Sequence, residues 1–180
     1  VMMAEPLMKA IEVALDFVGR TKGLRVFYPS PQGKLWNQES ANEFSHCDKM
    51  IFICGHYKGI DERVIDKYVT DEYSIGDYVL TNGELPSLVM LDSILRLVPG
   101  TLNNIDSALT DTFSLGLLDY PHYTQPRRFD DKEVPEVLVS GHHEKIESWR
   151  QEQRIMRTKK KRPDLWEKYK KSRQSEKDNE

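Results

Sequence analysis

The chain has 180 residues, which is enough to bury one sizeable hydrophobic core, and a net charge of −3 at pH 7. Hydrophobic residues make up 38% of it, and apolar runs such as Met50–Cys54 have the length of a strand, not of a helix that crosses a bilayer. Two cysteines, Cys47 and Cys54, are too few for a disulfide framework, and we find no secretory signal. We therefore expect a cytoplasmic protein with no membrane partner.

The charge is distributed unevenly along the chain. Residues 1–149 hold 14 Lys and Arg against 23 Asp and Glu, whereas residues 150–180 hold 12 against 6. A basic end on an acidic body is typical of a docking arm that contacts phosphates while another part of the protein recognises the bases. The alternative is a solvated helix followed by a frayed end.

Hydrophobic spacing predicts a series of alternating helices and strands in the first half of the chain. The spacing of Leu7, Ile11, Leu15 and Val18 predicts an amphipathic helix over Pro6–Arg20. The segments that follow are predicted in turn as a strand at Leu24–Tyr28, a weak helix at Glu39–Phe44, a strand at Lys49–Cys54, a short helix at Asp61–Tyr68 that Asp61 begins, a strand at Thr70–Ile75 and a strong helix at Leu85–Leu97.

The last of these helices is expected to bury one face, made by Leu88, Leu91, Ile94 and Leu95. Because the strands carry continuous and not alternating apolar residues, they fit a parallel sheet that is covered by helices on both faces. The sequence therefore predicts the α/β class for this part of the chain.

The second half is less regular. Pro99–Pro135 contains four prolines and no sustained periodicity, which is typical of a linker. Ser140 is expected to cap a helix from about His142 to Lys160, and Arg162-Pro163 to break it before a second helix. We expect a cofactor-binding domain at 1–98, a linker at 99–135, a small helical domain at 136–172 and a disordered tail at 173–180.

Glycine-containing segments follow each of the three predicted strands, at residues 28–33, 54–59 and 74–86. The carboxyl ends of parallel strands are where open α/β sheets bind ligands, and glycine lets the backbone approach a ligand closely. None of the three segments matches a G-x-G-x-x-G turn or a phosphate-binding loop. They predict a binding cleft of another kind.

Four motifs resemble the bacterial tRNA guanine-N1 methyltransferase family of the knotted SPOUT class. They are GHYKGIDER at 55–63, SIGDYVLTNGELP at 74–86, GLLDYPHYTQP at 116–126 and VSGHHE at 139–144. The resemblance runs from Val1 to about Trp166. It implies a parallel sheet with a deep trefoil knot, and transfer of a methyl group from S-adenosylmethionine to N1 of the guanosine 3′ of the anticodon, position 37. Family members begin with a further segment, so the resemblance also implies that this chain lacks the N-terminal part of the domain.

The resemblance assigns a role to individual residues. The residues that it implies for cofactor binding are Tyr28, Pro29, Ser30, Pro31, Gly55, Tyr57, Gly59, Ile75, Gly76, Tyr78, Leu80, Asn82, Gly83 and Pro86. It makes Asp111 the base that takes the N1 proton, and Arg96 the cation that stabilises charge on the purine oxygen. The residues implied for tRNA contact are His56, Lys58, Asp119, His122 and His142.

The same resemblance implies a homodimer whose active site is shared between subunits, and an anticodon arm bound by the helical domain. His56 and Lys58 stand where the family often has Arg and Glu, and Asn82 stands where it usually has glycine, a change that asparagine's tolerance of left-handed backbone would ease. Magnesium is associated with the family's reaction, but no acidic cluster indicates a dedicated site. The alternative function is a non-catalytic tRNA-binding protein that retains the knotted scaffold.

Overall fold

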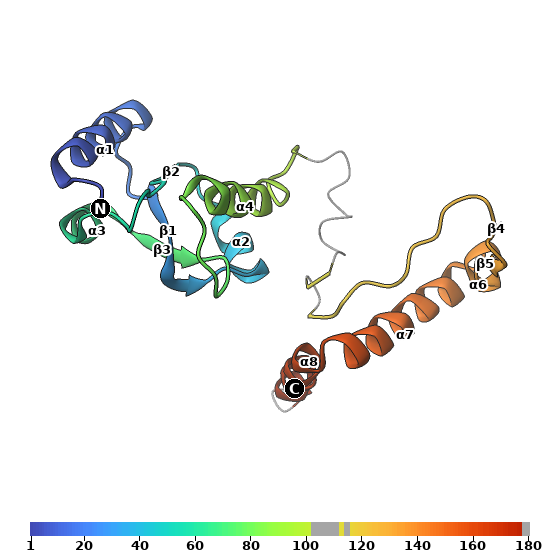
Figure 1. The fold of residues 1–180 in the computed structure, drawn as a ribbon. Helices are drawn as coiled ribbons and strands as arrows, with labels where there is room; N and C mark the ends of the chain where they lie inside the picture. The colour runs from blue at the N-terminus through green and yellow to red at the C-terminus, as the bar shows by residue number, and fades with distance from the viewer. Residues whose placement is uncertain (102–111, 114–115, 178–180) are drawn as a thin grey trace. The chain divides into compact units, whose positions relative to one another are not determined.

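The computed structural model describes residues 1–101, 112–113 and 116–177 (Figure 1). The chain divides into two compact units, residues 1–105 and residues 106–180. Each unit is described by itself below.

The first unit is built on a three-stranded parallel sheet. Its strands are β1 (Arg25–Leu35), β2 (Met50–Phe52) and β3 (Asp71–Ser74), in the order β2-β1-β3. Arg25–Phe27 of β1 pairs with Met50–Phe52, and Phe27–Pro29 pairs with Asp71–Tyr73, both in parallel. The predicted parallel sheet and its three strands are confirmed.

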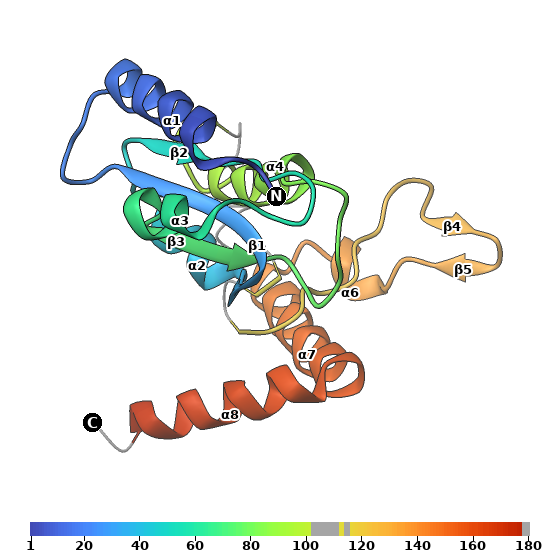
Figure 2. The same cartoon turned by 60° about the vertical axis from the view of Figure 1, so that its left-hand side comes forward.

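Helices cover both faces of this sheet (Figure 2). Val26 and Tyr28 of β1 pack with α1 (Ala4–Val18) and α3 (Glu62–Tyr68) on one face. Phe27, which points the other way along the strand, packs with α2 (Gln38–Phe44) and α4 (Glu84–Leu95). The α/β class with a doubly covered sheet is therefore also confirmed. In this arrangement, the carboxyl ends of the strands lie beside the three glycine-containing segments.

Side-chain caps set where the short helices begin. Asp61 caps α3 by accepting a hydrogen bond from the Arg63 amide at 3.0 Å, as the sequence predicts. Asn37 caps α2 in the same way, through the Ser40 amide at 2.9 Å.

The predicted buried face of α4 is correct at Ile94 and wrong at Leu88 and Leu95. Met90 and Ile94 are 0% and 1% exposed, whereas Leu88 and Leu95 are 59% and 42% exposed. The apolar residues of α4 are distributed around all sides of the helix, so their spacing does not indicate which face packs on the sheet. The consequence is an apolar surface on α4 that the rest of the first unit leaves uncovered.

The second unit contains a short antiparallel hairpin and a series of helices. The hairpin strands are β4 (Arg128–Phe129) and β5 (Lys132–Glu133), and α6 (Glu136–Val139), α7 (His143–Lys161) and α8 (Pro163–Lys177) follow. Residues 130 and 131 at the turn both have positive φ, at 48° and 56°. Aspartate tolerates this conformation, and a run of two aspartates with no glycine is a weak turn signal, so the sequence does not predict the hairpin within the expected linker.

Two helix boundaries differ from expectation in this unit. The N-cap of α7 is His142, and Ser140 instead ends α6, so the predicted serine cap is wrong. The break before α8 falls at Arg162-Pro163, as predicted. Helix α8 then continues to Lys177, into the segment expected to be disordered, because Lys, Arg, Glu and Gln are good helix formers.

The boundary between the two compact units falls after residue 105, later in the sequence than the boundary expected at residue 98. The described residues around 118 belong with the C-terminal helices, because the Leu118 amide donates to Thr158 Oγ1 at 2.9 Å and Asp119 pairs with Arg154. Thr158 lies on α7 and is fully buried. Part of the expected linker is thus packed structure.

Candidate functional site

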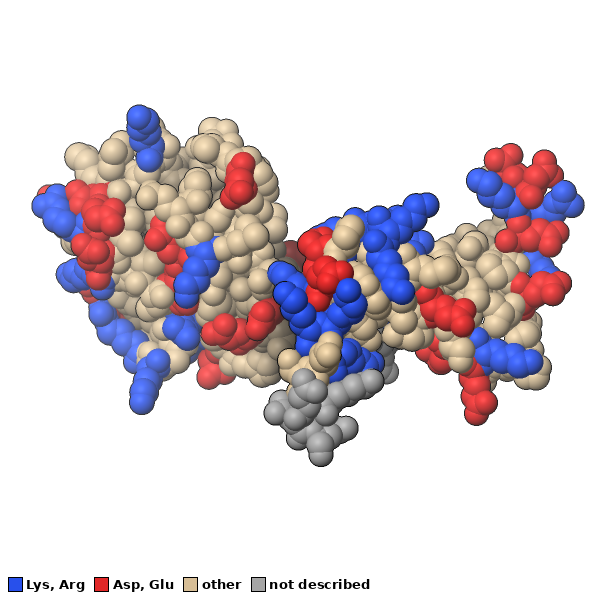
Figure 3. Space-filling model, turned by 90° about the horizontal axis from the view of Figure 1, so that it is seen from below, with Lys and Arg blue, Asp and Glu red and all other residues tan. Residues whose placement is uncertain are grey.

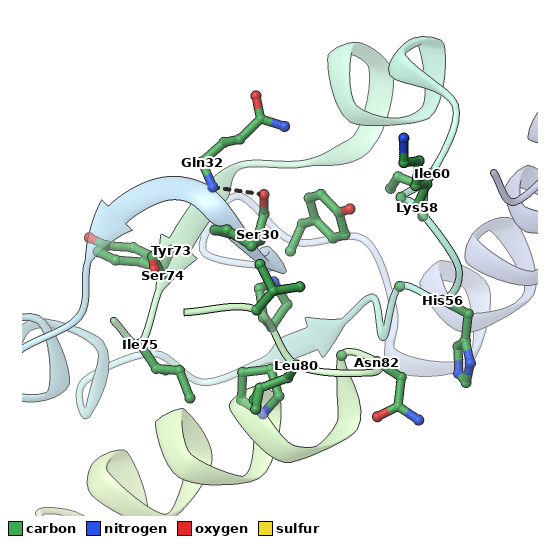
Figure 4. Close-up of a pocket in the computed structure, with 18 of the residues that line it drawn as sticks. Ser30, Gln32, His56, Lys58, Ile60, Tyr73, Ser74, Ile75, Leu80 and Asn82 are labelled. Atoms are coloured by element: carbon green, nitrogen blue, oxygen red, sulfur yellow. Dashed lines mark hydrogen bonds between the residues drawn. The ribbon is translucent and has the colours of Figure 1, made fainter. Parts of the chain in front are cut away.

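A cavity of about 380 Å³ lies in the first unit, where the three strands end (Figure 4). It is lined by the end of β1, the segment after β2 and the segment between β3 and α4. This is the edge at which parallel sheets bind ligands. Three segments far apart in the sequence therefore form one concave site.

All fourteen residues that the resemblance implies for cofactor binding line this cavity, and so do His56 and Lys58. Their roles toward a ligand remain predictions, but their convergence on one place is an observation. The lining also includes residues that the sequence analysis did not single out: Gln32, Ile60, Glu62, Ile65, Tyr73, Ser74, Val79 and Thr81. Most of them adjoin a predicted residue in sequence, so taking each glycine-containing segment whole would have included them.

Two glycines permit the close approach of the segments. A Cβ atom on Gly83 would lie 2.6 Å from the Gly55 nitrogen and 2.8 Å from the Cys54 Cα atom. A Cβ atom on Gly33 would lie 2.4 Å from the Tyr73 nitrogen. The Gly83 amide donates to the Gly55 carbonyl at 2.8 Å, which joins the third segment to the second. Only glycine fits at these positions without a backbone shift.

Other backbone features shape the walls. Gly59 and Gly76 have φ of 136° and 149°, a region that side chains rarely adopt. Tyr57 also has positive φ, at 61°, whereas Asn82 is not among the described residues with positive φ. The left-handed tolerance of asparagine is therefore not used at Asn82. Ser74 Oγ donates to the Gly76 carbonyl at 3.0 Å and fixes the turn after β3.

Tyr28 forms part of the cavity floor and is 7% exposed. Burial raises the pKa of its phenol, and the negative charges of Glu72 and Glu62 add to the effect. The hydroxyl therefore stays neutral at physiological pH and offers a hydrogen-bonding group next to a largely apolar ring.

A hydrogen bond between two side chains connects two of the walls. His56 Nε2 and Glu84 Oε1 lie 2.6 Å apart. The pKa of the Glu84 carboxyl group is lowered, chiefly by its own backbone amide at the start of α4. Burial opposes this effect, and the His56 imidazole lowers the pKa further. His56 lies at the edge of the group of side chains drawn in Figure 4.

Of the two residues expected to perform catalysis, Arg96 is not among the described residues that line the cavity. Arg96 is the C-cap residue of α4, in the same unit as the cavity. Asp111, the expected base, lies outside the described residues.

Three residues expected to contact tRNA lie in the second unit. Asp119 pairs with His122 Nε2 at 2.9 Å and with Arg154 Nε at 3.4 Å, and its own side chain is 17% exposed. The Tyr120 ring lies between two cations, with the guanidinium groups of Arg150 and Arg154 at 4.8 and 5.0 Å from its centroid. These contacts hold the 119–122 segment on α7. His142, the third of these residues, is exposed at the start of α7.

Basic side chains gather on the helices of the second unit, as Figure 3 shows in blue. The last turn of α7 carries Lys159, Lys160 and Lys161. Lys159 lies over the Trp166 ring at 4.5 Å, which leaves Lys160 and Lys161 as exposed cations of this turn. A positively charged surface of this kind attracts the phosphates of nucleic acids.

Two features are absent from the part of the chain that the structure describes, a metal-binding cluster and a membrane-spanning helix. It has no group of three or more His, Cys, Asp and Glu placed to hold a metal ion. It also has no helix with the length and apolar character needed to cross a membrane.

The sheet, its doubly covered faces and the cavity at its carboxyl edge define the protein as an α/β protein with a small-molecule site, attached to a basic helical unit. The family model described as "tRNA (Guanine-1)-methyltransferase TrmD" matches residues 1–168. The chain belongs to that family.

Curated relatives of similar sequence carry one name, tRNA (guanine-N(1)-)-methyltransferase. The relative from Lachnospira eligens is 52% identical over 176 residues, which are 98% of this chain and 74% of the relative. That from Lachnoclostridium phytofermentans is 56% identical over 82% of this chain and 54% of its own length. That from Staphylococcus haemolyticus is 50% identical over 94% and 67%. The chain thus spans between about half and three quarters of the length of these relatives.

Proposed function

We propose that this protein is a tRNA methyltransferase that transfers the methyl group of S-adenosylmethionine to N1 of the guanosine 3′ of the anticodon, position 37. The observation that carries the proposal is the convergence of all fourteen expected cofactor-binding residues on one cavity. The names of the relatives, each a guanine-N1 methyltransferase, favour this function over a non-catalytic tRNA-binding protein. The free cysteines, Cys47 and Cys54, suit the reducing cytoplasm in which we place it.

The cavity fits S-adenosylmethionine in size and in chemistry. Its volume of about 380 Å³ lies within the range of small-molecule sites. The glycines in its lining leave room for a ligand beside the backbone, the side chains of Gln32 and Asn82 are polar groups suited to adenine and ribose, and Leu80 and Ile75 offer apolar contact. The cofactor, when bound, supplies an electrophilic methyl group on a sulfonium sulfur.

The guanine substrate requires a base, because its N1 carries a proton at neutral pH. We assign proton removal to Asp111, because a carboxylate positioned at the guanine can accept one proton. Arg96 stabilises the negative charge that forms on the purine oxygen as the proton leaves. A guanidinium is suited to this role because it stays charged at every physiological pH.

The proposal includes a trefoil knot formed by the three segments around the cavity. The bond between Gly83 and Gly55, and the space that the missing Cβ of Gly83 leaves free, support a close crossing of the second and third segments. We expect a threaded third segment to keep the cavity walls together without a ligand.

We also propose a homodimer whose active site is shared between subunits. Leu85, Leu88 and Val89 on α4 are 59%, 59% and 50% exposed, and Val79 beside the cavity is 83% exposed. Apolar side chains gathered next to a site in this way are typical of a surface that another chain covers. Two-fold pairing is the commonest assembly of soluble proteins. The second unit, with its basic helices, is assigned to the anticodon arm, and Asp119, His122 and His142 to contacts near the target base.

The experiment that tests this function measures methyl transfer from S-adenosylmethionine to a tRNA transcript with guanosine at position 37, beside one with adenosine there. We expect transfer to the first transcript only. Asp111→Ala is expected to lower the rate at least about 100-fold, because general-base catalysis contributes that much or more. Its affinity for S-adenosylmethionine, measured by calorimetric titration, is expected to stay within about twofold of the unmodified chain, because the assigned role of Asp111 is at the guanine and not in the cofactor site.

Binding of tRNA without any methyl transfer would contradict the proposal and support the non-catalytic alternative. Transfer to the adenosine transcript would contradict the assigned target. Sedimentation equilibrium on the same protein gives the number of chains in the assembly, for which we expect two.

A further inference from the structure

The bond between His56 and Glu84 spans two walls of the cavity. His56 lies in the segment after β2 and lines the cavity, and Glu84 is the first residue of α4. Their side chains meet at 2.6 Å between Nε2 and Oε1. His56, which the resemblance assigns to tRNA contact, is thus already hydrogen-bonded to a residue of the protein itself.

The backbone bond directly beside this pair joins the same two segments. The Gly83 amide donates to the Gly55 carbonyl at 2.8 Å, one residue before Glu84 and one residue before His56. The backbone contact and the side-chain contact therefore form one two-point connection. A single hydrogen bond would allow rotation about it, whereas two adjacent bonds fix both the distance and the orientation of the segments.

The far side of the His56 segment is also held. The His56 amide donates to Met2 Sδ at 3.2 Å, and the Met2 amide donates to the Gly59 carbonyl at 2.9 Å. The imidazole is thus one of two side chains that connect this anchored segment to α4. The other is Cys54, whose Sγ lies 3.4 Å from Ser87 Oγ, further along the helix.

Glu84 depends on this partner. Its second carboxylate oxygen, Oε2, is buried and has no hydrogen-bond partner among the described residues. The side-chain hydrogen bond that fixes this half-exposed carboxylate is the one between Oε1 and His56 Nε2. Removal of the imidazole is therefore expected to move Glu84, and the start of α4 with it.

We propose that His56 is a positioning residue of the cofactor cavity, which acts through Glu84 to hold the 54–59 segment against the start of α4. This role replaces the tRNA contact expected from the resemblance, and it rests on the proposed function. The residues that it positions, Tyr57 and Gly59 on one wall and Asn82 on the other, are cavity-lining residues.

The test is a double-mutant cycle on cofactor affinity. Calorimetric titration with S-adenosylmethionine is made on the full chain, on His56→Ala, on Glu84→Ala and on the double variant. Each single substitution is expected to raise the Kd about tenfold, and the double variant to show no further increase, because both remove the same contact. The Kd of His56→Ala for tRNA is expected to equal that of the unmodified chain.

A rescue variant and two matched controls make the result specific. His56→Arg keeps a cation that donates to Glu84 and is expected to keep cofactor affinity within about twofold. His46→Ala removes an exposed histidine that contacts the Asn42 carbonyl outside the cavity, and Glu39→Ala removes a first-turn glutamate of α2. Both controls are expected to leave the cofactor Kd unchanged.

Three results would overturn the proposal. One is an unchanged cofactor Kd for His56→Ala together with weaker tRNA binding, which would restore the expected tRNA contact. Another is an approximately hundredfold weakening of cofactor binding in the double variant, because independent effects multiply. The third is a failure of His56→Arg to rescue. A full chain that binds no S-adenosylmethionine overturns the proposed function itself, and this proposal with it. If an alanine variant does not fold, His56→Leu and Glu84→Gln keep the side-chain volume and are judged by the same outcomes.

Discussion

At the scale of single residues, the cavity depends on places where the backbone has no side chain. A Cβ atom on Gly83 would lie only 2.6 Å from the Gly55 nitrogen, and the neighbouring atoms belong to the backbone, which cannot turn aside as a side chain does. The shape of this site therefore depends on the space that a missing side chain leaves free, as well as on the functional groups around it.

We predict that Gly83→Ala destabilises the protein and weakens its binding of S-adenosylmethionine. Forcing a methyl group into a closely packed place costs about 1–3 kcal/mol, and here it separates two cavity walls. Urea unfolding and calorimetric titration measure the two effects. Gly23→Ala is the matched control, because a Cβ atom there meets nothing within 4 Å and its φ is not in the left-handed region. Equal stability of the two variants would contradict the prediction.

The sequence predicts a site residue when that residue belongs to a local motif. The motifs at 55–63 and 74–86 place whole segments, so Gly55, Ile75 and Pro86 could be assigned before their positions in space were known. The bond between His56 and Glu84 could not be predicted in this way, because it joins residues 28 apart in sequence and depends on how two segments cross.

At the scale of elements, the same contrast holds between strands and helix faces. The strands are predictable because continuous apolar runs of about four to six residues have few alternatives in a parallel sheet. The buried face of α4 is not, since Leu88 and Met90 look equivalent in sequence and differ only in which one the sheet covers. The β4–β5 hairpin is not predictable in this way either, because its turn uses Asp130 and Asp131 in place of glycine.

Helix α3, which covers one face of the sheet, begins with a charged cap whose effect depends on pH. Asp61 accepts hydrogen bonds from the Arg63 backbone amide at 3.0 Å and from its guanidinium at 2.9 and 2.7 Å. The Arg63 side chain and amide lower the pKa of Asp61 to about 2, from an ordinary value of 3.8. A carboxyl group whose pKa is lower in the folded state stabilises the fold above its unfolded pKa, and this contribution disappears as the pH falls to about 2.

We predict that Asp61→Asn lowers the thermal midpoint at pH 7 and leaves it unchanged at pH 2. Asparagine keeps the capping hydrogen bond, so the substitution removes the charge and the hydrogen bond that Arg63 Nη2 donates to Oδ2. Thermal unfolding of both proteins between pH 2 and pH 7 measures the difference. Comparison of the two proteins is needed because Arg162 also lowers the pKa of Asp164 to about 2, and that effect is common to both. Asp48→Asn, at an exposed loop residue, is the control, and a difference that persists at pH 2 would refute the assignment.

At the scale of the whole molecule, the two units divide the work of the proposed reaction. The first unit holds the cavity for the methyl donor, and the C-terminal part of the second, residues 150–180, holds 12 Lys and Arg against 6 Asp and Glu. If each unit performs its own task, changes in one are expected to leave the other's binding intact. Salt provides a means to separate them, because phosphate contacts release counterions and the small cavity has few charged groups.

We predict that replacing both Lys160 and Lys161 by alanine weakens tRNA binding and makes it less sensitive to salt. Each lysine that no longer meets a phosphate is expected to reduce the slope of log K against log salt by about one. Filter binding at salt concentrations between about 50 and 200 mM measures the slope. The Kd for S-adenosylmethionine is expected to stay the same, because both lysines lie in the second unit. The control is Lys9→Ala, on α1 in the first unit, where the lysine is paired with Glu5 at 2.8 Å. An unchanged slope for the double variant would mean that the basic turn is a solvated surface and that the anticodon arm binds elsewhere.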